Sequence, residues 1–383
     1  MKRLFVLIAL FLPLAAQGAK VKIGFVNSIT GPEAPIGENL TNGVTLAIDD
    51  LKAKGIEVDL IKEDDTGKPE KSMAAFEKLA TRDKVAGVVG PYSSKCASAL
   101  AKLAEKYKVP LLIPVAAKDD ITRQNLKWTF RLSATTSDYA TILLDMATKL
   151  GKPRSMAIIS ENTDFGTSGA KSAKEYAAKK GIAIVAEEAY APGSPDYRST
   201  LASIKSKKPD LVFMVSYVAD AILLMRQSRE IGLQPQAFLG AGAGFATVAF
   251  AKEKDISSNI FSSTQWTGDV NWPGAKEFAQ RYRTRFGKEP TYHAATAYES
   301  MMIMAQTAQR AGQNPVKTRD ALKSGKWNGI MGEVRFLDYA GYTNQNRHQM
   351  LVEQIQNGVH ETVYPPQYVS KKPVFPFPGW GGH

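Results

Sequence analysis

Two serines, Ser93 and Ser94, lie between a glycine–proline turn and a helical stretch, a pattern that predicts an anion-binding site. Residues 86–89 lack polar alternation and indicate a buried strand, which Gly90-Pro91 ends. A serine then caps a helix expected to run to about Tyr107. Free backbone N–H groups and the helix dipole attract negative charge at such a helix start. The same pattern is also typical of an ordinary capped helix.

Patterns that would indicate an enzyme or a cofactor are weak in this chain. Ser168 and Lys171 match an SxxK motif, but the SDN and KTG partners of that motif are missing. The run Gly240–Gly244 lacks the third glycine of a dinucleotide site, which would fall at Phe245. No histidine has metal-ligand spacing to another or to a cysteine pair among His293, His348, His360 and His383. We therefore expect a binding protein with no cofactor and no metal.

Length and composition limit the class of protein. A chain of 383 residues exceeds one hydrophobic core, so two domains are expected. The net charge of +12 raises nucleic acid as a partner, but the lysines are scattered without interleaved aromatic residues. A solvated surface and no nucleic-acid partner are therefore expected. The single cysteine, Cys96, excludes an internal disulfide. Either a packing role or a thiol pKa lowered by the helix start is expected for Cys96.

The N-terminus has the three parts of a secretory signal peptide. Residues 1–3 are basic, residues 4–14 are apolar but too short to span a bilayer, and residues 15–19 are small. Cleavage is expected after Gly18 or Ala19. No cysteine follows the apolar run, so we expect a protein exported to the periplasm without a lipid anchor.

Strands alternate with helices along the chain, which predicts parallel sheets covered by helices on both faces. The first run of expected strands spans 21–26, 56–61, 86–89 and 109–113. A second run repeats the order at 156–159, 182–185, 211–215 and 237–239. This repetition predicts two similar doubly wound α/β lobes.

Three crossings between the lobes are expected, near 131–137, 265–270 and 342–348. They divide the chain into a signal peptide at 1–19, lobe I at 20–134 plus 267–343, and lobe II at 135–266 plus 344–383. Beyond residue 270, helices are expected at 273–286, 294–311 and 316–324, and strands at 334–336 and 350–355. The proline-rich tail, 371–380, is expected to be extended, either packed on the surface or disordered. Ligands bind at the carboxyl ends of such sheets, which here face the cleft between the lobes.

Short motifs occur in a consistent order along nearly the whole mature chain. They include Thr30-Gly31-Pro32, Gly90-Pro91-Tyr92-Ser93-Ser94, Pro114–Ala117, Phe130-Arg131, Phe165-Gly166 and Lys208–Val212. In order and spacing they resemble the periplasmic leucine/isoleucine/valine-binding protein family, the type I substrate-binding proteins of ABC importers. The resemblance implies a monomeric receptor with the periplasmic binding protein-like type I fold, a small-molecule carboxylate as ligand and an inner-membrane ABC permease as partner.

The resemblance also implies which residues bind the ligand. The carboxylate would be held by Ser94 and by backbone groups of the loop after the next strand. Phe165 and Tyr217 would close over it from the other lobe, and Tyr92 and Ile36 would line the pocket. The full set of candidate ligand-binding residues is Ile36, Tyr92, Ser93, Ser94, Val115, Ala116, Ala117, Phe165, Tyr217 and Gly242.

Two of these positions depart from the amino-acid binders of the family. Those proteins carry a threonine where this chain has Ala117, and a carboxylate that pairs the ligand's ammonium where it has Gly242. A buried ammonium without an acceptor loses several kcal/mol. The expected ligand is therefore a hydrophobic or aromatic acid without an α-ammonium. An amino acid remains the alternative if Glu161, Asp164 or Asp220 supplies the anion, and a ligand-sensing domain without transport is a further one.

Overall fold

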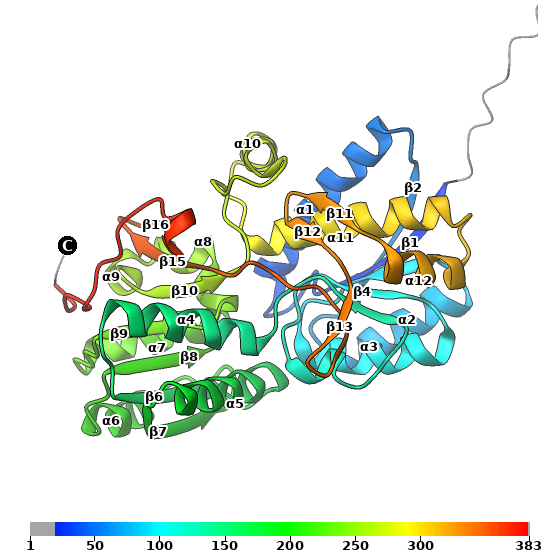
Figure 1. Cartoon of the computed structure of the whole chain (residues 1–383). Helices are drawn as coiled ribbons and strands as arrows, with labels where there is room; N and C mark the ends of the chain where they lie inside the picture. Colours follow the sequence, from blue (N-terminus) through cyan, green and yellow to red (C-terminus); the bar gives the residue numbers. More distant parts are fainter. Residues whose placement is uncertain (1–19, 382–383) are drawn as a thin grey trace, which may run out of the picture.

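The computed structural model of the protein describes residues 20–381, which form two α/β lobes (Figure 1). The expected signal peptide lies outside the described residues. Lobe I contains a seven-stranded sheet and lobe II another, each with one antiparallel edge. In lobe I the strand order is β13 (Leu337–Tyr339), β14 (Tyr342–Gln345), β5 (Thr129–Arg131), β4 (Leu111–Ile113), β3 (Gly87–Val89), β1 (Val21–Asn27) and β2 (Val58–Asp64).

Lobe II repeats this arrangement. Its strand order is β16 (Val359–Tyr364), β15 (Leu351–Gln356), β10 (Phe261–Thr264), β9 (Ala237–Gly240), β8 (Leu211–Val215), β6 (Ser155–Glu161) and β7 (Ala183–Tyr190). The central strands of both sheets are parallel and buried, as their apolar runs predict. Two similar, doubly wound lobes are therefore confirmed.

Helices cover both faces of each sheet (Figure 1). In lobe I they are α1 (Ala34–Ala53), α2 (Pro69–Thr81), α3 (Ser94–Tyr107), η1 (Asp119–Thr122), α10 (Ala275–Phe286), α11 (Tyr292–Arg310) and α12 (Pro315–Ser324). In lobe II they are α4 (Thr136–Leu150), α5 (Asp164–Lys179), α6 (Arg198–Ser206), α7 (Val218–Glu230), η2 (Ala243–Ala246), α8 (Val248–Lys252), α9 (Lys254–Ser257) and η3 (Pro366–Tyr368). Among the described residues, no helix is both long and apolar enough to cross a bilayer.

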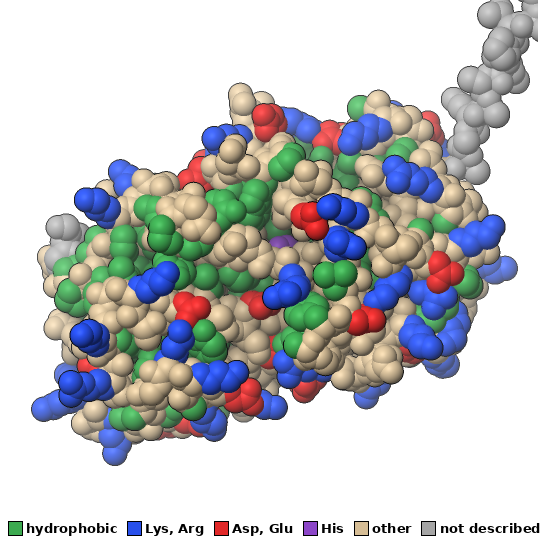
Figure 2. Space-filling model, in the orientation of Figure 1, with side chains coloured by type: hydrophobic (Ala, Val, Ile, Leu, Met, Phe, Trp, Pro, Cys, Tyr) green, Lys and Arg blue, Asp and Glu red, His purple; other side chains and the backbone are tan. Residues whose placement is uncertain are grey.

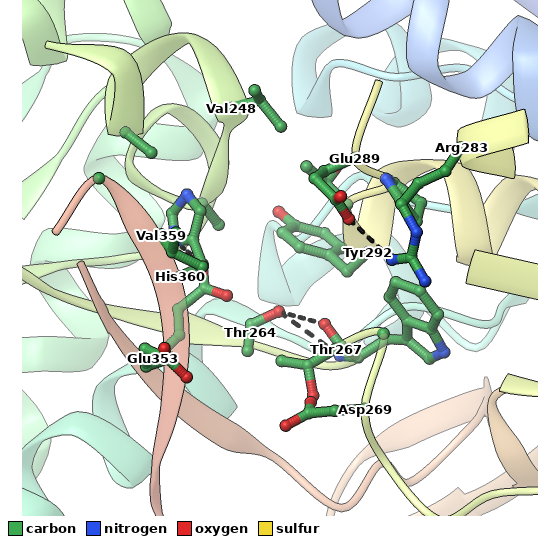
Figure 3. A pocket seen from close by; sticks show the side chains of 18 residues that line it. Val248, Thr264, Thr267, Asp269, Arg283, Glu289, Tyr292, Glu353, Val359 and His360 are labelled. Atoms are coloured by element: carbon green, nitrogen blue, oxygen red, sulfur yellow. Dashed lines mark hydrogen bonds and ion pairs between the residues drawn. The ribbon is translucent and has the colours of Figure 1, made fainter. Parts of the chain in front are cut away.

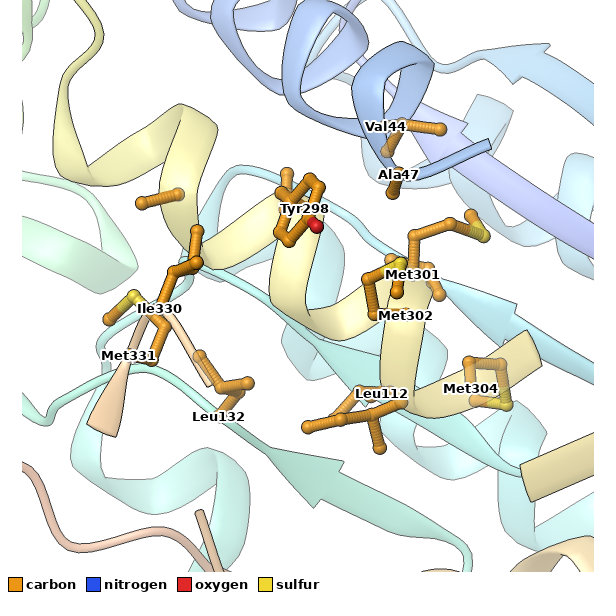
Figure 4. Close-up of a cluster of buried hydrophobic side chains, with 14 of the residues drawn as sticks. Val44, Ala47, Leu112, Leu132, Tyr298, Met301, Met302, Met304, Ile330 and Met331 are labelled. Carbon is orange, nitrogen blue, oxygen red and sulfur yellow. The ribbon is translucent and has the colours of Figure 1, made fainter. Parts of the chain in front are cut away.

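The core of lobe I is divided by its sheet, because successive strand residues point to opposite faces. Val89 and Leu112 belong to the core beneath α1 and α11, whereas their neighbours Val88 and Leu111 belong to the core beneath α2 and α3. Figure 4 shows part of the first core, in which methionines of α11 lie between Val44 of α1 and Leu112 of β4. The sheet is thus held rigidly, and the loops at its carboxyl edge are fixed in position.

The segment between α12 and the last crossing differs from the expectation. The strand expected at 334–336 ends at Val334: it is β12 (Gly332–Val334), which pairs with β11 (Trp327–Gly329) outside both large sheets. Asn344 and Gln345 lie in β14 of the first sheet, so the boundary proposed at 343 moves beyond Gln345. Both differences arise where strands of three or four residues carry too few side chains for a periodic signal.

The proline-rich tail packs on lobe II, so disorder is the wrong alternative for its described part. The rings of Phe377 and Trp380 lie 5.4 and 5.5 Å from the ring of Phe238 at the start of β9. The Phe377 N–H donates to the Gln236 carbonyl at 2.7 Å, and the Trp380 indole N–H donates to the Leu233 carbonyl at 2.8 Å. The tail therefore covers the amino-terminal edge of the sheet, away from the cleft.

Trp380→Ala is expected to lower the free energy of unfolding of lobe II by about 1–3 kcal/mol, because aromatic packing and one hydrogen bond are lost. Urea titration followed by circular dichroism measures the change. The control is Val374→Ala, since this side chain of the same tail is 36% exposed; a change within about 0.5 kcal/mol is expected there. Equal effects of the two substitutions would contradict the specific role of the indole ring.

Candidate functional site

Loops from both lobes meet where the carboxyl edges of the sheets face each other. The ring of Tyr92, after β3 of lobe I, lies 5.5 Å from the ring of Tyr217, after β8 of lobe II. Tyr217 in turn stacks on Phe165 of α5 at 5.3 Å, with an angle of 25° between the rings. Three of the candidate aromatic residues therefore form one cluster across the cleft. Such an arrangement offers flat apolar surfaces to a planar or branched ligand.

The start of α3 provides polar donors beside this cluster. Helix α3 begins at Ser94 as expected, but the Ser93 side chain makes no capping hydrogen bond. The Ser94 hydroxyl oxygen accepts from the Lys118 N–H at 3.2 Å. Burial raises the pKa of the Tyr217 phenol, and the nearby Ser94 backbone opposes this rise. The Ser94 hydroxyl proton can still donate to another acceptor. The Tyr217 side chain of lobe II thus lies near the helix start where the sequence predicts an anion.

The loop after β4 carries Val115, Ala116 and Ala117, all of which are buried. A fully buried arginine, Arg131, donates hydrogen bonds to this loop. Its Nη1 donates to the carbonyls of Lys118 at 2.6 Å and of Ala116 at 3.3 Å. Its Nη2 donates to the Thr122 hydroxyl at 2.7 Å, and its Nε donates to the side-chain oxygen of Gln345 at 2.6 Å. In the sequence, Arg131 is part of a motif, and no role is expected for it.

Asp119, in η1 of lobe I, links the two lobes. Its carboxylate accepts from Ser137 of α4 at 2.7 Å, from Ser172 of α5 at 2.8 Å, from Thr136 at 3.0 Å and from Tyr342 of β14 at 2.6 Å. Although burial opposes ionisation, the hydrogen bonds from Tyr342 and Ser137 lower the pKa of Asp119. Asp119 is therefore a charged inter-lobe contact beside the first crossing, and the sequence did not indicate it.

A second polar contact joins the lobes between α3 and α5. Asp164 of α5 accepts from the Lys118 ammonium at 2.8 Å and from the Ser98 hydroxyl at 2.9 Å. Asp164 therefore pairs with a cation from lobe I in this structure. Asp220 is also engaged, because it accepts from the Tyr197 hydroxyl at 2.8 Å and from the Gly193 N–H.

Two carboxyl groups lie near the aromatic cluster. Glu161, at the end of β6, accepts from the Tyr217 N–H at 3.2 Å and from the Thr163 hydroxyl. Glu33, just before α1 in lobe I, accepts from the Ser28 hydroxyl at 3.1 Å. Burial raises the pKa of each to about 7, and the charges of both act on the phenols of Tyr92 and Tyr217. Of Glu161, Asp164 and Asp220, the carboxyl groups proposed to pair an ammonium, only that of Glu161 accepts a hydrogen bond from a candidate site residue.

Glu161→Gln is expected to change how stability depends on pH. Burial raises the pKa of Glu161 from 4.5 to about 7, so between these values the folded chain keeps a proton that the unfolded chain has lost. Wild-type stability relative to the variant should therefore fall by about 1–3 kcal/mol as the pH rises through this window, and then stay level. Urea titrations across the window measure it, with exposed Glu175→Gln as control. Free energies of unfolding that change equally with pH in the wild type and in Glu161→Gln would contradict the prediction.

Two further positions are clarified by the structure. Gly242 has a φ of 60°, and a Cβ there would lie 3.2 Å from the Ser263 carbonyl oxygen and 3.3 Å from the Tyr139 ring. A side chain at Gly242 would thus be strained and crowded. Cys96 is buried, and burial raises the pKa of its thiol to about 12. The packing role of Cys96 is therefore supported, and the lowered thiol pKa is wrong.

Comparisons with known proteins agree on one family. The family model described as periplasmic binding protein matches residues 20–359. The Leu/Ile/Val-binding protein homolog 7 of Brucella suis is 27% identical over 376 residues, covering 93% of this chain and 94% of that protein. The isoleucine complex of LivJ from Streptococcus pneumoniae has a TM-score of 0.81 at 26% identity, covering 90% and 100%. A benzoate complex from R. palustris has a TM-score of 0.82 at 19% identity, covering 92% and 99%.

Proposed function

Because the chain belongs to the periplasmic binding protein family, we propose that it is the substrate-binding protein of an ABC importer. It is exported to the periplasm, captures a small carboxylate between its lobes as a monomer, and delivers it to a permease in the inner membrane. The observation that carries this proposal is the start of α3 in lobe I, which directly follows Tyr92, whose ring contacts the ring of Tyr217 from the opposite lobe. A ligand carboxylate would bind at this helix start.

Capture is non-covalent and requires no catalytic group. The carboxylate accepts from the Ser94 N–H and hydroxyl, where the positive end of the α3 dipole adds to its stability. Val115, Ala116 and Ala117 border the same turn, while Tyr92, Phe165 and Tyr217 enclose the apolar body. Since Phe165 and Tyr217 belong to lobe II, the ligand favours the closed arrangement through contacts that it makes only there.

The ligand class follows from the groups around this space. The aromatic cluster suits a hydrophobic or aromatic acid, and Gly242 offers no side chain to pair an α-ammonium. An amino-acid ligand is the second candidate, because the Glu161 carboxyl lies against the Tyr217 N–H and its charge reaches the cluster. The fold itself does not determine the ligand class, since similar structures hold isoleucine in one protein and benzoate in another.

A thermal-shift screen of matched ligand pairs, followed by calorimetry, tests the proposal. Leucine is compared with isocaproate, and phenylalanine with hydrocinnamate, because the members of each pair differ only in the ammonium group. The acids are expected to raise Tm, with about 2.7 kcal/mol of stabilisation at one hundred times Kd. Tight binding of leucine without binding of isocaproate would contradict a ligand that lacks an α-ammonium and would favour an amino-acid ligand. Permease and ATPase genes beside this gene would distinguish transport from sensing.

A further inference from the structure

A separate cavity of about 370 Å³ lies between the lobes beside the second crossing. Figure 3 shows its walls: Arg283, Glu289 and Tyr292 come from lobe I, and Val248, Glu353 and His360 from lobe II. Thr264, Thr267 and Asp269 of β10 and the crossing form the base. None of the ten candidate ligand-binding residues lines this cavity. Figure 2 shows a hollow between the lobes, bordered by hydrophobic side chains on the lobe II side.

The charges around the cavity are unbalanced toward the negative. The Arg283 guanidinium pairs with Glu289 at 2.9 Å at the rim, and the His360 Nδ1 lies 3.0 Å from the Glu353 carboxylate in the wall. Asp269 and Glu361 also line the cavity, and the described side chains offer them only hydroxyl donors, Thr362 at 3.4 Å and Ser370 at 3.2 Å. Two carboxylates thus remain without a cationic partner among residues 20–381.

Most of the rest of the lining is apolar or aromatic, and Gly268, Thr291 and Gly358 complete it. The apolar and aromatic residues are Ala246, Val248, Ala251, Trp266, Pro290, Tyr292 and Val359. Aromatic faces next to uncompensated carboxylates attract an organic cation both by charge and through their π electrons. An anion would instead meet repulsion from the same carboxylates. We propose that this cavity is a second ligand site, which takes a small organic amine with an apolar body.

Tyr292, which lines this cavity, also contacts residues next to the proposed carboxylate site. The Tyr292 hydroxyl accepts from the Ala243 N–H at 3.1 Å, beside Gly242, and the Tyr292 ring stacks on His293 at 3.9 Å. The His293 ring lies 5.9 Å from the ring of Tyr92. Because its walls belong to both lobes, the cavity changes shape when the lobes rotate. An amine bound there would therefore contact both lobes at once.

Calorimetric titration with phenethylamine tests the second site, with phenethyl alcohol as the neutral match. We expect saturable binding of the amine and at least about 5-fold weaker binding of the alcohol. Asp269→Asn should weaken amine binding about 3- to 5-fold by removing one carboxylate, and Val248→Trp should abolish it by filling the cavity. Asp255→Asn is the control, because Asp255 is exposed on α9 and does not line the cavity.

Ser94→Ala separates this inference from the proposed function. That variant should leave the phenethylamine affinity unchanged, whether or not Ser94 binds a carboxylate. Absence of saturable amine binding would overturn the second site, and so would binding that survives Val248→Trp. Loss of amine binding in Ser94→Ala alone would place the amine in the cleft beside α3 and would likewise overturn it.

Discussion

Arg131→Met is expected to lower the free energy of unfolding of lobe I by about 3–5 kcal/mol. The guanidinium is fully buried and donates to two carbonyls of the loop after β4 and to the side chains of Thr122 and Gln345. Methionine fills similar space but leaves these acceptors without their donor. It also removes the positive charge that faces the buried Asp119. Urea titration, fitted with a separate transition for each lobe, measures the loss.

Arg198→Met is the matched control for this prediction. Arg198 pairs with Glu230 at 2.6 Å and with Asp196 at 3.1 Å, but its side chain is half exposed on α6. Exposed ion pairs contribute about 0–1 kcal/mol, so the control should barely change stability. A similar small change in Arg131→Met would show that the loop does not depend on the buried guanidinium.

Ser94→Ala is expected to raise the Kd of the best-binding acid from the screen about 5- to 150-fold, equivalent to about 1–3 kcal/mol. The substitution removes the hydroxyl donor to a buried carboxylate, while the backbone N–H stays in place. Calorimetry measures the affinity, and circular dichroism checks that the variant is folded. Ser203→Ala, at an exposed position of α6, is the control and should bind as the wild type does. An unchanged Kd in Ser94→Ala would remove Ser94 from the site.

The sequence predicted the architecture well where elements are long and apolar. Strands such as β8, with five successive buried residues, have the continuous apolar run that is typical of central parallel strands. Strand β5 was missed because its three residues include the buried polar Arg131. Strand β16 was missed although Asn357-Gly358, both with positive φ, form the type of turn that joins hairpin strands. The sequence therefore contains a signal for this hairpin.

The candidate site was predictable where it depends on topology alone. Tyr92 and Tyr217 each follow the carboxyl end of a central parallel strand, and such ends meet across a cleft. The role of Asp119 was not predictable, because its partners include Ser172 and Tyr342, which are far apart in sequence. Glu33 and Arg131 likewise gain their roles through burial, for which a single charged residue in a sequence gives no local signal.

A crystal structure of the protein with the best-binding acid tests the account most directly. We expect the ligand carboxylate within about 3 Å of the Ser94 nitrogen and hydroxyl, with the ring of Phe165 against the ligand's apolar body. A carboxylate bound elsewhere, with no contact to the Ser94 N–H or hydroxyl, would contradict the proposed function.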